Sequence, residues 1–125
     1  MKKIESKNAP KALGPYSQAV AAGDFVFCSG QIGVDAKSGT LQDGVEAQTK
    51  QALKNLEEVV KAAGLKLSAV VSTTVYLRDM DDFTAMNDVY ASFFSEEPMP
   101  ARATVEVSKL PKGALVEISC IAVKS

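Results

Sequence analysis

The stretch from Asp43 to Gly64 constrains the fold most, because its apolar residues recur at the spacing of a helix. They fall three, four or seven positions apart, at Val45, Ala52, Leu56, Val59 and Ala63. Asp is a residue type that caps helix starts and Gly one that ends helices. The pattern therefore predicts an amphipathic helix over 43–64, whose apolar stripe packs against another element.

Two other segments predict strands. Residues 17–30 read as a β-hairpin, because two apolar runs flank a turn at 22–24 that contains Gly23 and Asp24. Both residue types tolerate the backbone dihedrals of tight turns. Residues 69–77 are rich in β-branched side chains, and we expect them to form a long central strand.

The C-terminal third predicts a second helix and two more strands. Asp81 or Asp82 can begin the helix, and the prolines after position 97 end it. Its apolar stripe consists of Phe83, Met86, Val89, Tyr90 and Phe93. The strands are expected in the runs 100–107 and 115–123, joined by a short turn.

This order of elements indicates an α+β fold in which two helices pack on one face of a sheet. A chain of 125 residues can bury a substantial core, and we expect a single domain spanning 1–125. The predicted strands carry apolar residues in both alternating phases, so the face without helices is also half apolar. Apolar patches of that size usually mark subunit contacts, which predicts a homo-oligomer built on the uncovered face.

Charge and composition argue against nucleic acid and membrane partners. The chain has 14 basic and 15 acidic residues, with no blocks of like charge. It contains neither a secretory apolar segment nor an apolar run long enough to span a bilayer, which favours a cytoplasmic protein. Cys28 and Cys120 both fall inside apolar strand runs, so we interpret them as small buried residues.

The chain contains no histidine. This excludes Ser-His-Asp and Cys-His catalysis and any metal site built on histidine, and two cysteines alone cannot form a zinc cluster. The glycine-rich motifs that usually cradle phosphates do not occur either. We therefore expect chemistry that uses Glu, Asp, Lys, Tyr, backbone groups and water.

Two charges interrupt the predicted C-terminal strands. Arg102 alternates with the apolar phase of its run, and Glu117 lies off the purely apolar phase of the last strand. If the two strands are neighbours, a guanidinium that can grip a carboxylate and a carboxylate that can move a proton share one sheet face. A mutual salt bridge, or a pair between Arg102 and Glu106, would explain the same pattern without function.

Five motifs in order along the chain make the sequence recognisable. They are G-P-Y-S-Q-A-V at 14–20, F-C-S-G-Q-I at 27–32, T-T-V-Y-L-R-D-M-D-D-F at 73–83, P-A-R-A-T-V-E-V at 100–107 and V-E-I-S-C-I-A-V at 116–123. Together they resemble the RidA (YjgF) family of enamine/imine deaminases, over nearly the whole chain and without large insertions.

The resemblance implies a chorismate-mutase-like subunit with a mixed sheet, assembled as a homotrimer with one active site in each cleft between neighbours. It implies hydrolysis of 2-iminopropanoate and 2-iminobutanoate to 2-keto acids and ammonia, without a cofactor. The family arginine that grips the substrate carboxylate falls on Arg102, and the glutamate that orients the attacking water falls on Glu117.

The same resemblance places further family pocket residues on this chain, at Tyr16, Ser29, Gly30 and Asn87. One position departs from a common form of the pattern, because Thr104 stands where many members have cysteine. The family contact at that position is mainly through backbone groups, so we expect Thr104 to preserve hydrolysis without supporting thiol-dependent side activities.

Structural roles remain open for each of these residues. Gly30 can be a bulge or turn, Ser29 a hydrogen bonder at a strand end, Tyr16 a packed turn aromatic, and Asn87 a local partner within its helix. Two other functions remain open as well. One is a module that binds small carboxylates without turnover, and the other is an endoribonuclease or translation inhibitor, activities described for some family members.

Overall fold

A computed structural model describes residues 1–125. Its strands are β1 (Lys2–Ile4), β2 (Ala19–Ala22), β3 (Phe25–Ile32), β4 (Val70–Leu77), β5 (Ala101–Glu106) and β6 (Val116–Val123). Its helices are α1 (Val45–Ala62) and α2 (Phe83–Phe93), and short 3-10 turns occur at Leu67–Ala69, Met80–Asp82 and Pro111–Gly113. Every predicted helix and strand is present. The edge strand β1 was not predicted, because three residues are too few to show an alternating pattern.

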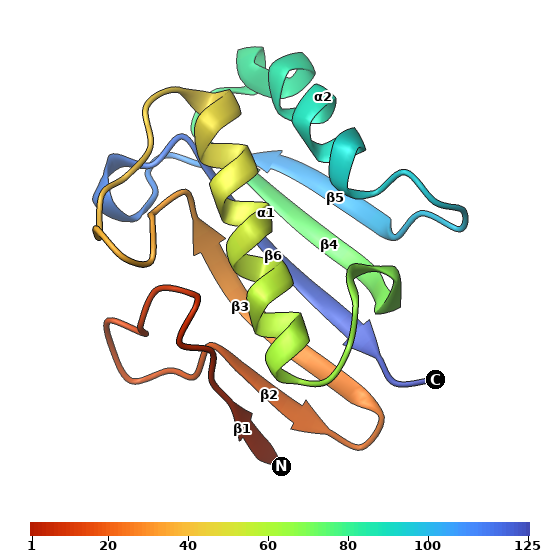
Figure 1. The fold of residues 1–125 in the computed structure, drawn as a ribbon. Helices are drawn as coiled ribbons and strands as arrows, with labels where there is room; N and C mark the ends of the chain where they lie inside the picture. The colour runs from red at the N-terminus through yellow and green to blue at the C-terminus, as the bar shows by residue number, and fades with distance from the viewer.

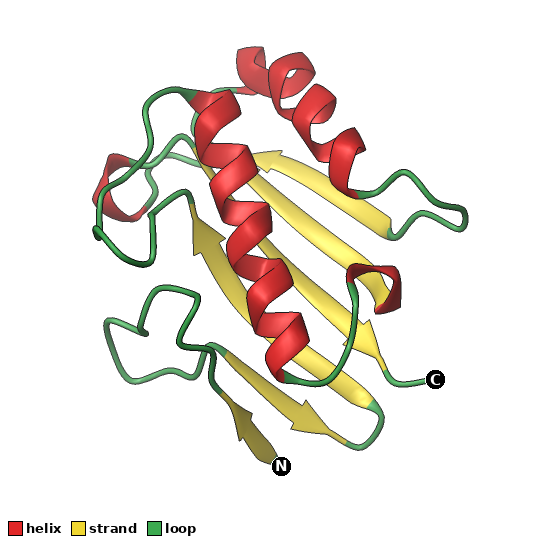
Figure 2. Ribbon diagram, in the orientation of Figure 1, coloured by secondary structure: helices red, strands yellow, loops and turns green.

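The six strands form one sheet in the order β1-β2-β3-β6-β4-β5, and both helices lie on the same face of it (Figures 1 and 2). Strand β5 runs parallel to β4, whereas all other neighbouring strands are antiparallel. The fold is therefore α+β with a mixed sheet and two helices on one face, as predicted. The last strand, β6, lies in the middle of the sheet, between β3 and β4.

The ends of α1 partly correct the prediction. The helix begins after Gly44, which has a φ of 87° and provides no side-chain cap, so Asp43 does not cap it. Only glycine adopts that backbone conformation at little cost. At the other end Gly64 has a φ of 81° and follows the last turn, as predicted.

The N-cap of α2 is Asp82, one of the two predicted positions, but its side chain makes no capping hydrogen bond. The capping oxygen belongs to Asp79, which accepts a hydrogen bond from the backbone of Asp81 at 2.9 Å and shapes the 3-10 turn that leads into the helix. The helix ends at Phe93, before the prolines.

The core lies between the helices and the sheet. Alternate residues of β6 face it, and Val116, Ile118, Cys120 and Ala122 are all buried, as the alternation predicted. They pack in one cluster with Leu53 and other apolar residues of α1.

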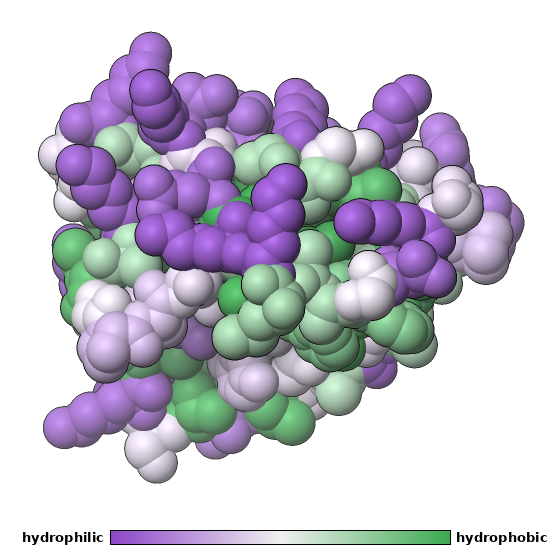
Figure 3. All heavy atoms as spheres, turned by 90° about the horizontal axis from the view of Figure 1, so that it is seen from below, coloured by the Kyte–Doolittle hydropathy of each residue, from purple (hydrophilic) through white to green (hydrophobic).

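The opposite sheet face has no helix over it and is partly apolar. Phe25 and Phe27 are 47% and 43% exposed there, and Val105 on the edge strand is 42% exposed. In the view from below, most of the strongly hydrophilic side chains lie in the upper part of the molecule, and hydrophobic side chains lie beneath them (Figure 3). No helix combines the length and apolar character needed to cross a bilayer.

Candidate active site

A cavity of about 260 Å³ opens beside Glu117. Three segments distant in the sequence form its walls: the loop that carries Tyr16, the end of β3 with Gly30, and the turn before β6 with Lys112. Of two larger hollows, one of about 540 Å³ lies elsewhere, and one of about 740 Å³ adjoins this cavity across the N-terminal loop and shares Tyr16 and Lys112 with it. The first contains none of the predicted site residues, and the second shares only Tyr16 with them.

Glu117 occupies the uncovered face of β6, opposite Ile32 of β3 and Tyr76 of β4. It is half-buried, and its carboxylate forms no salt bridge. Burial raises the pKa of this carboxyl above its ordinary value, and no neighbouring charge or hydrogen bond offsets the effect. An unpaired, partly desolvated carboxylate that borders a cavity is a suitable proton acceptor and donor.

Gly30 lies where the register between β3 and β6 shifts, so the bulge considered above as its structural role is present. The absence of a side chain there also has a steric reason. A Cβ atom on residue 30 would lie 2.8 Å from the carboxyl carbon of Glu117, closer than real Cβ contacts allow. Gly30 therefore makes room for the Glu117 side chain beside the cavity.

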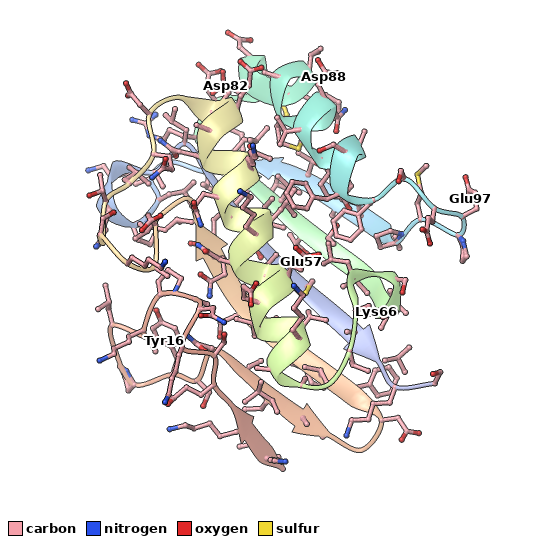
Figure 4. The ribbon with its side chains drawn as sticks, in the orientation of Figure 1. Tyr16, Glu57, Lys66, Asp82, Asp88 and Glu97 are labelled. Atoms are coloured by element: carbon pink, nitrogen blue, oxygen red, sulfur yellow. The ribbon has the colours of Figure 1, made fainter.

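Ser29 and Tyr16 differ in what surrounds them. The hydroxyl of Ser29 donates to the backbone carbonyl of Ser17 at 2.7 Å, which is the strand-end hydrogen bond considered above, and the residue does not line the cavity. Tyr16 lines it and is 53% exposed, so it is not a packed turn aromatic. It lies on the N-terminal loop, far from the end of α2 marked by Asp82 (Figure 4). Substrate contact by either residue stays a prediction.

Gln18 holds the loop that forms one wall of the cavity. Its buried amide nitrogen donates to the carbonyls of Ser6 at 3.2 Å, Ala9 at 3.4 Å and Pro10 at 2.7 Å. Its amide oxygen accepts from the backbone of Ser6 at 2.6 Å. This clamp was not predicted, because a single polar residue beside a strand has no periodic signal.

Two buried amides on α1 hold the other walls. Gln48 accepts a hydrogen bond from the backbone of Leu115 at 2.7 Å, and Asn55 donates to the carbonyls of Val34 at 2.9 Å and Ile32 at 3.2 Å. These contacts fix the end of β3 and the segment that enters β6. The sequence did contain a signal for them, since both polar residues fall on the helix stripe that faces the core.

Arg102 belongs to a second cluster, on the side of the sheet that the helices cover. Its guanidinium carbon lies 4.7 Å from the centre of the Tyr90 ring and 5.6 Å from that of Phe83, both on α2. Arg102 takes part in no salt bridge. Glu106 instead accepts a hydrogen bond from the backbone of Met80 at 2.8 Å, so the pair with Arg102 does not form.

Asn87 and Thr104 lie near this second cluster. Positions 83, 87 and 90 share one face of a helix, so Asn87 is on the face of α2 that carries the two rings in contact with Arg102. Thr104 is two residues from Arg102 on the same face of β5, opposite Val75. Its hydroxyl is buried without a hydrogen-bond partner.

The two clusters do not meet within the chain, which corrects the expectation that Arg102 and Glu117 share a face. Strand β4 separates their strands, with Arg102 opposite Thr73 and Glu117 opposite Tyr76. These rows are three positions apart along β4, so the side chains point to opposite faces, and ideal sheet spacing puts the Cα atoms of Arg102 and Glu117 about 14 Å apart. The mutual salt bridge is excluded for the same reason.

The cysteines and the acidic residues form neither a disulfide nor a cluster suited to a metal ion. Cys28 and Cys120 are free, buried and directly opposed on neighbouring strands, in agreement with the prediction. No group of three or more Cys, Asp and Glu side chains is placed to hold a metal ion.

Comparison with known proteins adds an independent line of evidence. The family model described as Endoribonuclease L-PSP matches residues 6–124, which include both clusters. A RutC family protein of Pyrococcus horikoshii is 52% identical over 122 residues, covering 97% of this chain and 96% of the relative. The 2-iminobutanoate/2-iminopropanoate deaminase of Salmonella typhimurium is 47% identical over 125 residues, covering 98% of each chain.

A solved structure agrees with the fold. The YjgF gene product of E. coli matches with a TM-score of 0.96 and 45% identity, and the match covers 100% of both chains. The arrangement of sheet and helices is therefore shared over the full length.

Proposed function

The chain belongs to the RidA (YjgF) family, and we propose that it hydrolyses small 2-imino acids such as 2-iminopropanoate and 2-iminobutanoate to 2-keto acids and ammonia. The observation that carries the proposal is the complementarity of the two clusters. One presents an arginine that takes part in no salt bridge, and the other a free carboxylate of raised pKa beside a cavity. The full-length similarity to a named imine deaminase supports it.

The proposed site lies between subunits of a homotrimer. Arg102 and Glu117 cannot act on one small molecule within a single chain, because they point to opposite faces of the sheet. The uncovered face has exposed aromatic residues such as Phe25 and Phe27, which a neighbouring copy would bury. Its docking there would bring the edge strand of one copy to the Glu117 cavity of another.

Arg102 binds the substrate in this scheme. Its planar fork can hold the carboxylate of a 2-imino acid through two hydrogen bonds, which fixes the position of the adjacent C=N group. The short chains of these substrates are compatible with a cavity of about 260 Å³. Fixing the reacting carbon beside a placed water removes much of the entropic part of the barrier.

Glu117 carries the proton transfers. It accepts a proton from water as the water oxygen bonds to the imine carbon, and that proton passes to the nitrogen as the C=N bond becomes a single bond. Glu117 then takes the hydroxyl proton of the resulting carbinolamine and delivers it to the nitrogen, so that the C=O bond forms, the C–N bond breaks and ammonia leaves. The raised pKa suits both roles, because the group can take and return a proton closer to neutral pH.

A coupled assay tests the activity. A serine or threonine dehydratase generates the imino acid in solution, and ammonia and 2-keto acid are measured with and without this protein. We expect faster product formation that saturates with imino acid. A protein that binds 2-keto acids without changing the rate would instead be a binding module. Cleavage of labelled RNA without acceleration would support an endoribonuclease.

The assembly is tested separately by sedimentation equilibrium at micromolar concentration. We expect three times the chain mass. A clean monomer would contradict the shared site, because it would leave each cluster without its partner.

A further inference from the structure

The surroundings of Arg102 are aromatic rather than acidic. Tyr90 and Phe83 are the groups that contact its guanidinium, at 4.7 and 5.6 Å from the ring centres, and neither salt bridge of the chain involves it. Arginine planes stack favourably on aromatic faces, and contact with a ring leaves the N–H groups at the edge of the plane free. A carboxylate can therefore reach that edge without displacing an existing partner.

The ring of Tyr90 is itself fixed. Its hydroxyl hydrogen-bonds to Thr73 at 2.8 Å, and its face packs against Phe94 with the ring centres 4.7 Å apart. Thr73 stands directly opposite Arg102 on the neighbouring strand. The ring is thus held by the side chain of the residue that stands opposite Arg102.

We propose that Phe83 and Tyr90 form an aromatic platform that positions the Arg102 guanidinium for the carboxylate of a 2-imino or 2-keto acid. Both are positioning residues, because they act through Arg102. The identity of the ligand rests on the proposed function, whereas the positioning of the Arg102 guanidinium by the two rings does not. Without the platform a long side chain on an edge strand samples many rotamers, and binding must order it at an entropic cost.

Phe83→Leu is the principal variant, because Phe83 is 37% exposed and its ring adds little to the core. Tyr90→Leu removes the second ring, and Tyr90→Phe keeps that ring without its hydroxyl. Phe94→Leu is the matched control, since Phe94 is buried against Tyr90 and is not among the rings that contact Arg102. It reports what loosening the aromatic cluster does by itself.

The first measurement is the affinity for 2-oxobutanoate by calorimetry, on assembled protein. We expect Phe83→Leu and Tyr90→Leu to weaken binding by about 2- to 30-fold each, the range of a cation–π contact. Tyr90→Phe and Phe94→Leu keep both rings that contact Arg102 and remove only a support of Tyr90, so they should weaken binding less than Phe83→Leu and Tyr90→Leu do. In an Arg102→Lys background the loss from Phe83→Leu should shrink to less than half on the free-energy scale, because lysine has no plane to stack. An equal loss in both backgrounds would overturn the proposal.

The second measurement is the NMR order parameter of the Arg102 Nε–H bond, which needs no ligand. The order parameter should fall in Phe83→Leu and in Tyr90→Leu, and fall less in Phe94→Leu, which keeps both rings that contact Arg102. If the wild type neither binds 2-oxobutanoate nor deaminates, the proposed function fails while this measurement still decides the platform. An unchanged order parameter in Phe83→Leu would rule the platform out even where Tyr90→Leu does not fold.

Discussion

Arg102 and Glu117 lie on opposite faces of the sheet, and β4 runs between the strands that carry them. The face of Arg102 is covered by helices, whereas that of Glu117 is open and partly apolar. Arg102 is on an edge strand, at a border of the sheet where a second copy can approach. The proposed deaminase site therefore has to be divided between copies.

Replacing Arg102 with lysine keeps the charge and removes both the planar fork and the stacking. We expect Arg102→Lys to weaken binding of the substrate carboxylate by roughly 1 to 3 kcal/mol, which is about 5- to 150-fold in kcat/KM. The fold and the assembly should not change, because Arg102 is exposed and takes part in no salt bridge. Wild-type turnover by the assembled variant would mean that the arginine is structural.

Glu117→Gln tests the proton transfer. The amide keeps the shape and the hydrogen-bonding capacity of the side chain but cannot take a proton from water. Deamination should fall on the order of 10²-fold, the typical contribution of a placed acid or base. Binding of 2-oxobutanoate through Arg102 should survive, and calorimetry on the same preparation checks it. If activity is normal, or if binding and assembly are lost together, Glu117 does not activate the water.

The raised pKa of Glu117 also predicts a pH dependence of stability. The folded state binds a proton more tightly than the unfolded chain, so the wild type loses stability as pH rises from the ordinary carboxyl pKa through the raised one. Glu117→Gln lacks this titration. Its free energy of unfolding should match that of the wild type at low pH and exceed it at neutral pH. Denaturant titrations at several pH values check the difference, and a variant less stable at neutral pH contradicts it.

Substitutions at Gly30 and Gly33 are expected to have different effects, because Gly30 makes room for Glu117 whereas Gly33 lies against the backbone of α1. Gly30→Ala places a Cβ atom 2.8 Å from the carboxyl carbon of Glu117, a side chain that can move away. We expect a small change in Tm and a large loss of activity, because Glu117 leaves its position. Gly33→Ala places the Cβ 2.6 Å from the backbone oxygen of Gln48, which α1 holds in place. That variant should lose several degrees of Tm. Comparable effects of both variants on Tm would contradict this assignment.

Glu117 shows what the sequence could predict about the site, and Arg102 shows what it could not. The central strand β6 has an apolar phase that is fully buried, so alternation placed Glu117 on the correct face. The edge strand β5 alternates Arg102 and Thr104 with small or apolar residues that remain exposed. There the apolar phase did not mark the core, because the long stem of an arginine can lie along aromatic residues while its head stays in solvent.

The pairing of strands was equally hidden. Strands β5 and β6 are consecutive in the chain, yet β6 crosses to the centre of the sheet and β4 separates the two. No local pattern encodes such a non-local choice, which depends on how all strands pack together. The hydrogen bonds of Gln18 could not be predicted for a related reason, since its partners lie 8 to 12 residues away along an irregular loop.

A mixing experiment tests whether the site is shared between copies. Arg102→Gln and Glu117→Gln subunits, each inactive alone, are co-expressed in equal amounts and purified as mixed trimers. A shared site is intact wherever a copy with wild-type Arg102 adjoins one with wild-type Glu117 in the right order, which occurs for about one quarter of sites in a cyclic trimer. A site within one chain can never be restored in this way.

The reciprocal mixture is the control. A chain with both substitutions is co-expressed with wild type in equal amounts. About one quarter of shared sites are again intact, whereas about half would be intact if each site lay within one chain. Restoration in the first mixture together with the lower value in the second requires Arg102 and Glu117 from different copies. No restoration in the first and half activity in the second would show that the chain brings the two residues together by itself, against the geometry of its sheet.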